Sequence, residues 1–88
     1  MSSPPNIIGP VVRDLRLAKG WTQAMLAARC ARLGWDMSEN TVTKIEKQFR
    51  CVSDREIVCL ARALGVRLEE VFPADARQPR RPDGAAGS

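Results

Sequence analysis

The sequence contains no histidine, and its three cysteines include no Cys-x-x-Cys pair. Histidine is the commonest general base and the commonest metal ligand in proteins. Three scattered thiols suit neither a disulfide framework nor a zinc site, and the chain has no glycine-rich phosphate loop. We therefore expect no enzymatic activity, no cofactor and no metal, and we expect Cys30, Cys51 and Cys59 to be reduced, small apolar residues.

Long apolar runs are also missing from the sequence. No segment approaches the roughly 18 consecutive apolar residues of a membrane span, and residues 1–6 lack the charged and apolar regions of a secretory signal. The chain has 88 residues, which allows one small domain and no separate ligand-sensing domain. We expect a cytoplasmic protein that makes no membrane contact.

Basic residues outnumber acidic ones, with 14 Lys and Arg against 10 Asp and Glu, and the net charge is +4. This surplus fits a polyanionic partner such as nucleic acid, although many domains with other functions reach it. Both ends of the chain are rich in proline and carry no apolar periodicity. We expect a flexible N-terminal arm over residues 1–6, a folded domain over residues 7–72 and a disordered tail over residues 73–88.

Within residues 7–72 the apolar positions repeat with the period of about 3.6 residues that is typical of α-helices. Capping residues and glycines predict five helices, over about residues 9–20, 22–34, 38–48, 53–65 and 68–72. Ser53 and Glu56 have the spacing of a capping box, in which each side chain bonds the other residue's backbone amide. The predicted fold class is all-α, a compact five-helix bundle.

The third predicted helix has one polar and one apolar side. At about 100° per residue, one arc carries Glu39, Asn40, Thr43, Lys44 and Lys47, and the opposite arc carries Val42, Ile45, Glu46 and Phe49. Asparagine can pair with adenine, lysine can donate to guanine, and a threonine methyl can contact thymine. Taken alone, this pattern is better explained by an ordinary amphipathic helix whose polar side is solvated, because most small helical proteins have such a side.

Six short motifs, taken in order, resemble the Cro and phage-repressor family of helix-turn-helix proteins, also called the xenobiotic-response-element type. They are VRDLR at 12–16, KGWTQ at 19–23, LA at 26–27, Ser38 to Ile45-Glu46, LARALGV at 60–66 and LEEVF at 68–72. The resemblance implies a lambda-repressor-like bundle. It also implies a transcriptional regulator, most often a repressor, that binds specific double-stranded DNA by inserting its third helix into the major groove.

The resemblance also implies roles for individual residues. The expected base-reading residues are Glu39, Asn40, Thr43 and Lys44. The expected phosphate contacts are Thr22, Gln23, Ser38, Lys47 and Arg50. Arg16 and Glu46 match a pair that bridges the first and third helices. Glu39 is unusual at a DNA surface because phosphates repel it; it either accepts a hydrogen bond from a cytosine amino group or stabilises the helix as a first-turn acid.

The sequence departs from the family pattern at three places. Seventeen residues separate Leu26-Ala27 from Ile45-Glu46, which is longer than the family's usual spacing and leaves the docking angle of the third helix open. We expect Trp35 to pack under this longer turn. Gln48 stands where the family has glycine, and Arg67 stands where it has a capping serine or threonine, so both are expected to lower local stability.

The resemblance further implies a homodimer, because two modules can read half-sites one helical turn, about 34 Å, apart. Apolar residues near the end of the domain are the predicted dimer interface: Val66, Leu68, Val71 and Phe72. The alternative is a protein-interaction module, such as an antitoxin that blocks a toxin or a regulator of another regulator, with a tail that folds on its partner.

Overall fold

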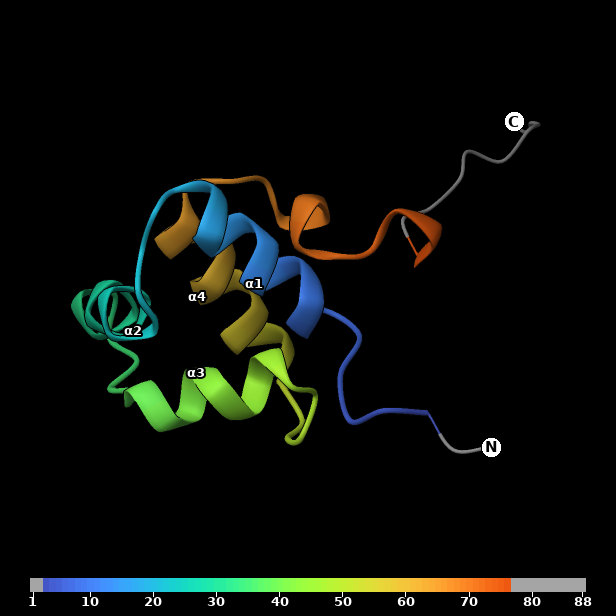
Figure 1. Cartoon of the computed structure of the whole chain (residues 1–88), viewed down its shortest axis with the longest axis horizontal. Helices are drawn as coiled ribbons and strands as arrows, with labels where there is room; N and C mark the ends of the chain where they lie inside the picture. Colours follow the sequence, from blue (N-terminus) through green and yellow to red (C-terminus); the bar gives the residue numbers. More distant parts are fainter. Residues whose placement is uncertain (1–2, 77–88) are drawn as a thin grey trace.

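The computed structural model describes residues 3–76, so the expectations for residues 1–2 and for most of the tail, residues 77–88, lie outside the described residues. The described chain forms α1 (Gly9–Ala18), α2 (Gln23–Arg32), α3 (Glu39–Glu46) and α4 (Asp54–Leu64), followed by two short 3₁₀ turns, η1 (Leu68–Val71) and η2 (Ala74–Ala76) (Figure 1). No strand occurs between residues 3 and 76. The all-α class is therefore confirmed.

The prediction of five helices is wrong, because the segment expected to form the fifth is the four-residue 3₁₀ turn η1. Phe72, directly after the turn, is extended, with φ −92° and ψ 149°. It precedes Pro73, whose ring disfavours the helical conformation in the residue before it. The chain therefore leaves the helical region after a single turn.

Side-chain caps fix the start of three helices. Thr22, Ser38 and Ser53 are the N-caps of α2, α3 and α4, and each side chain accepts a hydrogen bond from a first-turn backbone amide. The Ser53 hydroxyl accepts from the Glu56 amide at 3.2 Å, and the Glu56 carboxylate accepts from the Ser53 amide at 3.0 Å. The predicted capping box is confirmed.

The end of α3 differs from the prediction. The helix ends at Glu46 rather than near Gln48, and Gln48 adopts the left-handed conformation, with φ 64°. This reversal turns the chain before Phe49, which is 71% exposed instead of packing with the apolar side of the helix. The left-handed conformation at Gln48 explains why glycine suits this position in the family.

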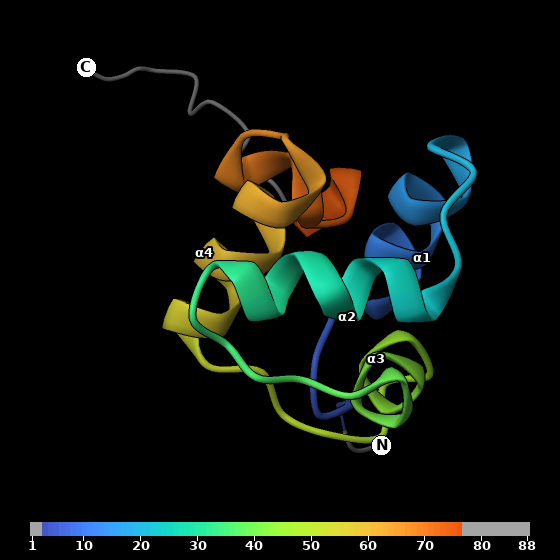
Figure 2. The same cartoon turned by 90° about the vertical axis from the view of Figure 1, so that its left-hand side faces the viewer.

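The core lies where the four helices meet. Its fully buried side chains come from every helix and from η1, and the largest are Ile8, Val12, Leu26, Val42, Ile45, Leu60, Leu64 and Val71. Helix α2 packs against both α3 and α4. Figure 2 shows α2 running across the molecule, with α3 seen end-on beneath one end of it and α4 at the other. The bundle therefore holds α3 by its apolar side and leaves the opposite side in solvent.

The start of α1 lies directly against the backbone at the end of α3. A Cβ atom on Gly9 would collide with the carbonyl oxygen of Ile45 and would lie 2.9 Å from that of Glu46. Only glycine permits this approach. None of the helices formed by residues 3–76 is long and apolar enough to span a lipid bilayer.

Candidate nucleic-acid interface

The outer side of α3 presents a row of polar side chains to solvent. Glu39, Asn40, Lys44 and Lys47 are exposed, and their side chains form no hydrogen bond or ion pair with any residue from 3 to 76. Thr43 is half-buried at the edge of this row. Beneath them, Val42 and Ile45 are each 1% exposed. The helix is thus anchored on one side, and the side chains on the other side are available to a ligand.

The expected pair of Arg16 and Glu46 lies at the centre of the bundle. Arg16 Nε and Nη2 donate to the two carboxylate oxygens of Glu46 at 2.7 and 3.0 Å, and Arg16 Nη1 donates to the carbonyl oxygen of Trp21 at 2.7 Å. The side chains are 9% and 2% exposed. This bidentate pair ties α1 to α3, and removing one partner of such a buried pair typically costs about 3–5 kcal/mol.

Gln23 extends this network from Glu46 to the outer side of α3. Its amide nitrogen donates to Glu46 Oε1 at 3.1 Å, and its amide oxygen accepts from the hydroxyl of Thr43 at 2.7 Å. Gln23 and Thr43, which the resemblance assigns separate roles at a DNA surface, are therefore in direct contact. Neither a motif nor the helical period relates two side chains that lie 20 residues apart.

The N-termini of α2 and α3 are two sites suited to anions. Thr22 and Ser38 are both exposed, and their side-chain oxygens accept from the amides of Met25 and Thr41, at 3.1 and 3.2 Å. The other first-turn amides have no partner within a helix, and the helix dipole gives this end a partial positive charge. Such ends are suited to binding phosphate oxygens.

Arg50 is less available than the sequence suggested. Its guanidinium is 3.4 Å from the Glu56 carboxylate and lies over the ring of Trp35, 5.9 Å from the centroid. Its Nη1 atom is buried and has no hydrogen-bond partner among the described residues. Arg50 therefore joins the turn before α3 to the start of α4.

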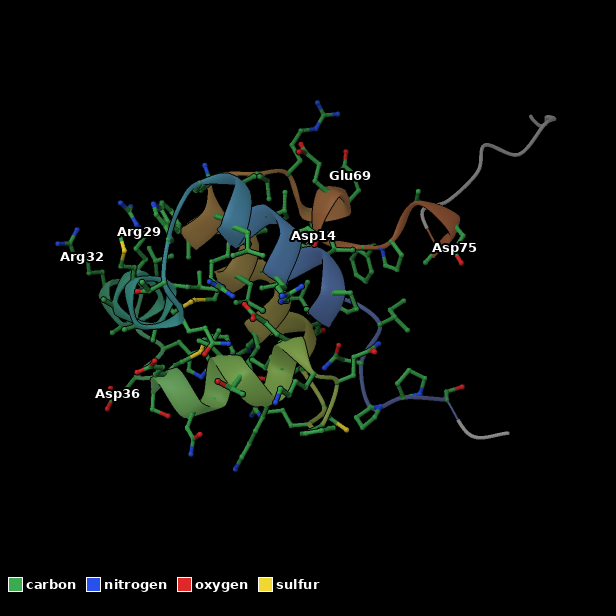
Figure 3. All side chains as sticks on the ribbon, in the orientation of Figure 1. Asp14, Arg29, Arg32, Asp36, Glu69 and Asp75 are labelled. Carbon is green, nitrogen blue, oxygen red and sulfur yellow. The ribbon has the colours of Figure 1, made fainter. Side chains whose placement is uncertain are left out.

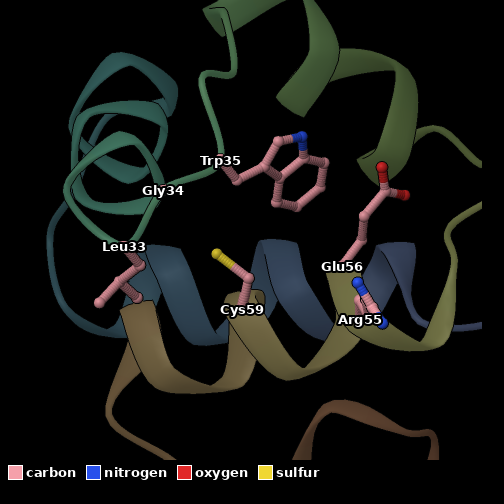
Figure 4. A pocket seen from close by; sticks show the side chains of 6 residues that line it. All are labelled: Leu33, Gly34, Trp35, Arg55, Glu56 and Cys59. Atoms are coloured by element: carbon pink, nitrogen blue, oxygen red, sulfur yellow. The ribbon is translucent and has the colours of Figure 1, made fainter.

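Trp35 packs against the core at the longer turn, as expected. Its ring borders a shallow hollow of about 390 Å³ between this turn and α4 (Figure 4). The hollow is lined by Leu33, Gly34, Trp35, Arg55, Glu56 and Cys59. The turn that leads into α3 therefore lies beside α4.

Asn6 belongs to the fold, although the sequence analysis placed it in the flexible arm. It is 8% exposed, and its amide nitrogen donates to the carbonyl oxygens of Ile45 and Arg50, at 3.1 and 2.9 Å. Its amide oxygen accepts from the Gly9 amide at 2.8 Å. An asparagine three residues before Gly9 was a usable signal, since asparagine is among the preferred residues for capping helices.

The residues expected at a dimer interface divide into two groups. Val71 is 0% exposed and belongs to the core, so its assignment to a dimer surface is corrected. The cause is η1, which packs against both α1 and α4 and turns Val71 inward. Val66 and Phe72 are half-buried against the core, and Leu68 is 46% exposed.

Two of the cysteines lie together between α2 and α4. The Cys59 sulfur is 3.9 Å from the carbonyl oxygen of Cys30. Burial raises the pKa of the Cys30 thiol to about 12, and the neighbouring Cys59 adds to this shift. No cluster of three or more potential metal ligands occurs in the described part of the chain.

The charged side chains are unevenly distributed around the bundle. Figure 3 places Arg29 and Arg32 on α2, whereas Glu69 and Asp75 lie on the side of the molecule away from α3. Asp36 lies close to the start of α3. Most of the outer side of α3 therefore faces away from these distant acids, and Asp36 and Glu39 are the acids near its first turn.

Comparison with known proteins agrees with this arrangement. A family model described as helix-turn-helix matches residues 12–71. The chain is 34% identical to the restriction-modification controller protein C.AhdI from Aeromonas hydrophila, with a TM-score of 0.66 over 74% of this chain and 87% of that one. It is 25% identical to the hypothetical transcription factor NHTF from Neisseria, with a TM-score of 0.70 over 85% of this chain and 82% of that one. No curated protein matches the chain.

These matches cover the bundle that positions α3, including the Arg16–Glu46 pair. The chain therefore belongs to the helix-turn-helix family, as a DNA-binding transcription regulator of the Cro and phage-repressor type.

Proposed function

We propose that this regulator binds specific double-stranded DNA sequences by placing the outer side of α3 in the major groove. The observation that carries the proposal is the exposed row of Glu39, Asn40 and Lys44, whose side chains have no partners among residues 3–76. An amide can bond adenine bidentately and a lysine can donate to guanine. Thr43, at the edge of the row, completes the proposed base-reading set.

The proposed phosphate contacts surround this row. Thr22 and Ser38 stand at helix N-termini suited to phosphate oxygens, and Lys47 supplies an exposed, unpaired cation at the other end of α3. Gln23 is a weaker candidate for a phosphate contact, because its side-chain amide is already bonded to Glu46. Arg50 would reach a phosphate only by releasing Glu56.

We further propose that the protein acts as a homodimer and as a repressor. One α3 touches few base pairs, whereas two copies read two half-sites. A domain of this size can block transcription by occupying DNA, which requires no activating surface. The proposal contains no catalytic step, and DNA is the only ligand it requires.

The experiment that tests the proposal is a selection from a random duplex library, followed by binding titrations at several salt concentrations. Asn40→Ala should weaken binding to the preferred duplex by about 1–3 kcal/mol, and this loss should depend on which base stands at one position of the duplex. Lys47→Ala should weaken binding to all sequences alike and reduce the salt slope by about one unit. Each variant is the control for the other, because both remove an exposed, unpaired side chain of the same helix or its C-cap.

Enrichment of no sequence by the wild-type protein would contradict sequence-specific binding. Equal effects of the two variants on all duplexes and at all salt concentrations would contradict the division between base and phosphate contacts.

A further inference from the structure

We propose that Gln23 holds Thr43 as a hydrogen-bond acceptor, so that Thr43 tolerates adenine, cytosine or thymine at the base it faces and disfavours guanine. The inference rests on the proposed function, because it specifies what one position of α3 reads. Gln23 acts as a positioning residue and need not contact the base itself.

The buried ion pair determines which way the Gln23 amide faces. Glu46 is 2% exposed at its side chain and is bonded to Arg16 through both carboxylate oxygens. A carboxylate in such a pair only accepts hydrogen bonds. The Gln23 group at 3.1 Å from Glu46 Oε1 must therefore be the amide NH₂, which donates. The amide oxygen then faces Thr43.

The Thr43 hydroxyl has one hydrogen, and both of its neighbours within the protein are acceptors. The amide oxygen of Gln23 lies 2.7 Å from Thr43 Oγ1, and the carbonyl oxygen of Glu39 lies 3.2 Å away. The shorter bond, to Gln23, is the stronger one by its length. With Gln23 in place the hydroxyl hydrogen therefore points at the Gln23 amide oxygen and is unavailable to a base.

What Thr43 still offers to a ligand is an oxygen lone pair and a methyl group. In the major groove, adenine and cytosine present amino groups that can donate to such an oxygen, and thymine presents a methyl. Guanine presents only the acceptors N7 and O6. A guanine at this position would set two acceptors against each other, and each would lose the water that had satisfied it.

Thr43 differs in this respect from its neighbours in the row. The side chains of Asn40 and Lys44 have no partner among the described residues, so each can turn toward the base that it meets. The half-buried Thr43 is held by α2 before any DNA arrives. Its preference is therefore set by the protein's own hydrogen bonds.

The test uses the best duplex from the library selection and its variants with each base at every position. Wild-type protein should show one position, distinct from the one affected by Asn40→Ala, at which guanine lowers affinity about tenfold, as expected for one unsatisfied acceptor. Thr43→Val removes the oxygen and should abolish this penalty. Gln23→Met removes the acceptor and frees the hydroxyl to donate, so the guanine penalty should fall to about threefold or less, because only the longer bond to Glu39 competes.

The double variant isolates the coupling between the two residues. Once position 43 is valine, Gln23→Met should have no further effect at that base, although it can still weaken all duplexes alike through a lost phosphate contact. Lys47→Ala is the control for such a uniform effect. Thermal unfolding checks that each variant folds, and Thr43→Val keeps the Gln23–Glu46 bond, so it carries the test if Gln23→Met does not fold.

An unchanged guanine penalty in Gln23→Met, together with its loss in Thr43→Val, would overturn the role of Gln23. Equal tolerance of all four bases near Thr43 by the wild-type protein would overturn the inference while leaving the proposed function intact. Failure of the wild-type protein to select any duplex would overturn the proposed function and this inference with it.

Discussion

At the scale of single residues, Asn6 joins three parts of the backbone that are far apart in the sequence. Its side chain bonds the carbonyl oxygens of Ile45 and Arg50 and the amide of Gly9. It therefore binds the first amide of α1 and closes the turn after α3 at the same time. Because α3 carries the proposed recognition surface, Asn6 also helps to set the position of that surface.

We predict that Asn6→Ala lowers the free energy of unfolding by about 1–3 kcal/mol, because the buried Gly9 amide and the Arg50 carbonyl oxygen lose their hydrogen-bond partner. Chemical denaturation measures this change. Asn40→Ala is a matched control, since it makes the same substitution at an exposed, unbonded residue and should change stability by less than about 0.5 kcal/mol. Equal stability of the two variants would contradict the role of Asn6.

Cys30 gives a prediction about pH. Its pKa is about 12 in the folded protein against 9.0 for an unperturbed thiol. Above pH 9 the unfolded chain releases this proton and the folded chain keeps it, so stability should fall as pH rises from 9 toward 12. The expected decrease is about 1.4 kcal/mol per pH unit.

The measurement compares urea unfolding of wild-type protein and Cys30→Ala at pH 8 and at pH 10.5. The variant is less stable at pH 8 because it leaves a cavity, but its stability should decline less between the two pH values. Parallel declines in the two proteins would show that burial does not protect this thiol from ionisation.

At the scale of the elements, the end of α3 depends on Gln48. Its left-handed backbone is unfavourable for a residue with a side chain, by about 1–2 kcal/mol. The side-chain nitrogen Nε2 of Gln48 donates to the carbonyl oxygen of Asn6 at 2.9 Å, and this bond offsets part of the unfavourable backbone energy. The turn thus uses a hydrogen bond where the family has a glycine.

We predict that Gln48→Ala lowers the unfolding free energy by about 1 kcal/mol, because it keeps the strained backbone and loses the bond to Asn6. Gln48→Gly also loses the bond but relieves the strain, so it should be more stable than the alanine variant by about 1 kcal/mol. Denaturation of the three proteins tests the order. An alanine variant as stable as the glycine variant would contradict the argument from backbone strain.

The elements show why some of the fold was predictable. Helix starts depend on residues close in sequence, such as Ser53 and Glu56, and the apolar period identified the buried side of α3. The end of α3 depends instead on the left-handed backbone of Gln48 and its bond to the distant Asn6, and η1 is kept short by Pro73, which the apolar period does not register. In the candidate site, the helical period predicted the outward row, and the family resemblance implied the Arg16–Glu46 pair. Two other contacts could not be predicted from the sequence. The bond from Asn6 to Ile45 joins residues that are 39 apart in the chain, and the bond between Gln23 and Thr43 joins residues that are 20 apart.

At the scale of the whole molecule, the candidate DNA surface and η1 lie on different sides of the bundle (Figure 1). A second copy that docks near η1 would therefore leave the outer side of α3 free for DNA. Leu68 is the exposed apolar residue of this turn, at 46%, and Val66 and Phe72 lie half-buried nearby in the chain.

We predict that Leu68→Glu produces a monomer at concentrations where the wild-type protein is a dimer, because it places a charge where two apolar surfaces would meet. Sedimentation measures the oligomeric state, and titration of a two-half-site duplex should lose cooperative binding. Leu17→Glu is the matched control, because Leu17 is 50% exposed on α1, outside the proposed interface. Val71→Glu would be uninformative, since Val71 is 0% exposed and a charge there would unfold the protein. A wild-type protein that stays monomeric with and without the duplex would contradict the homodimer, and equal dissociation by both leucine variants would place the interface elsewhere.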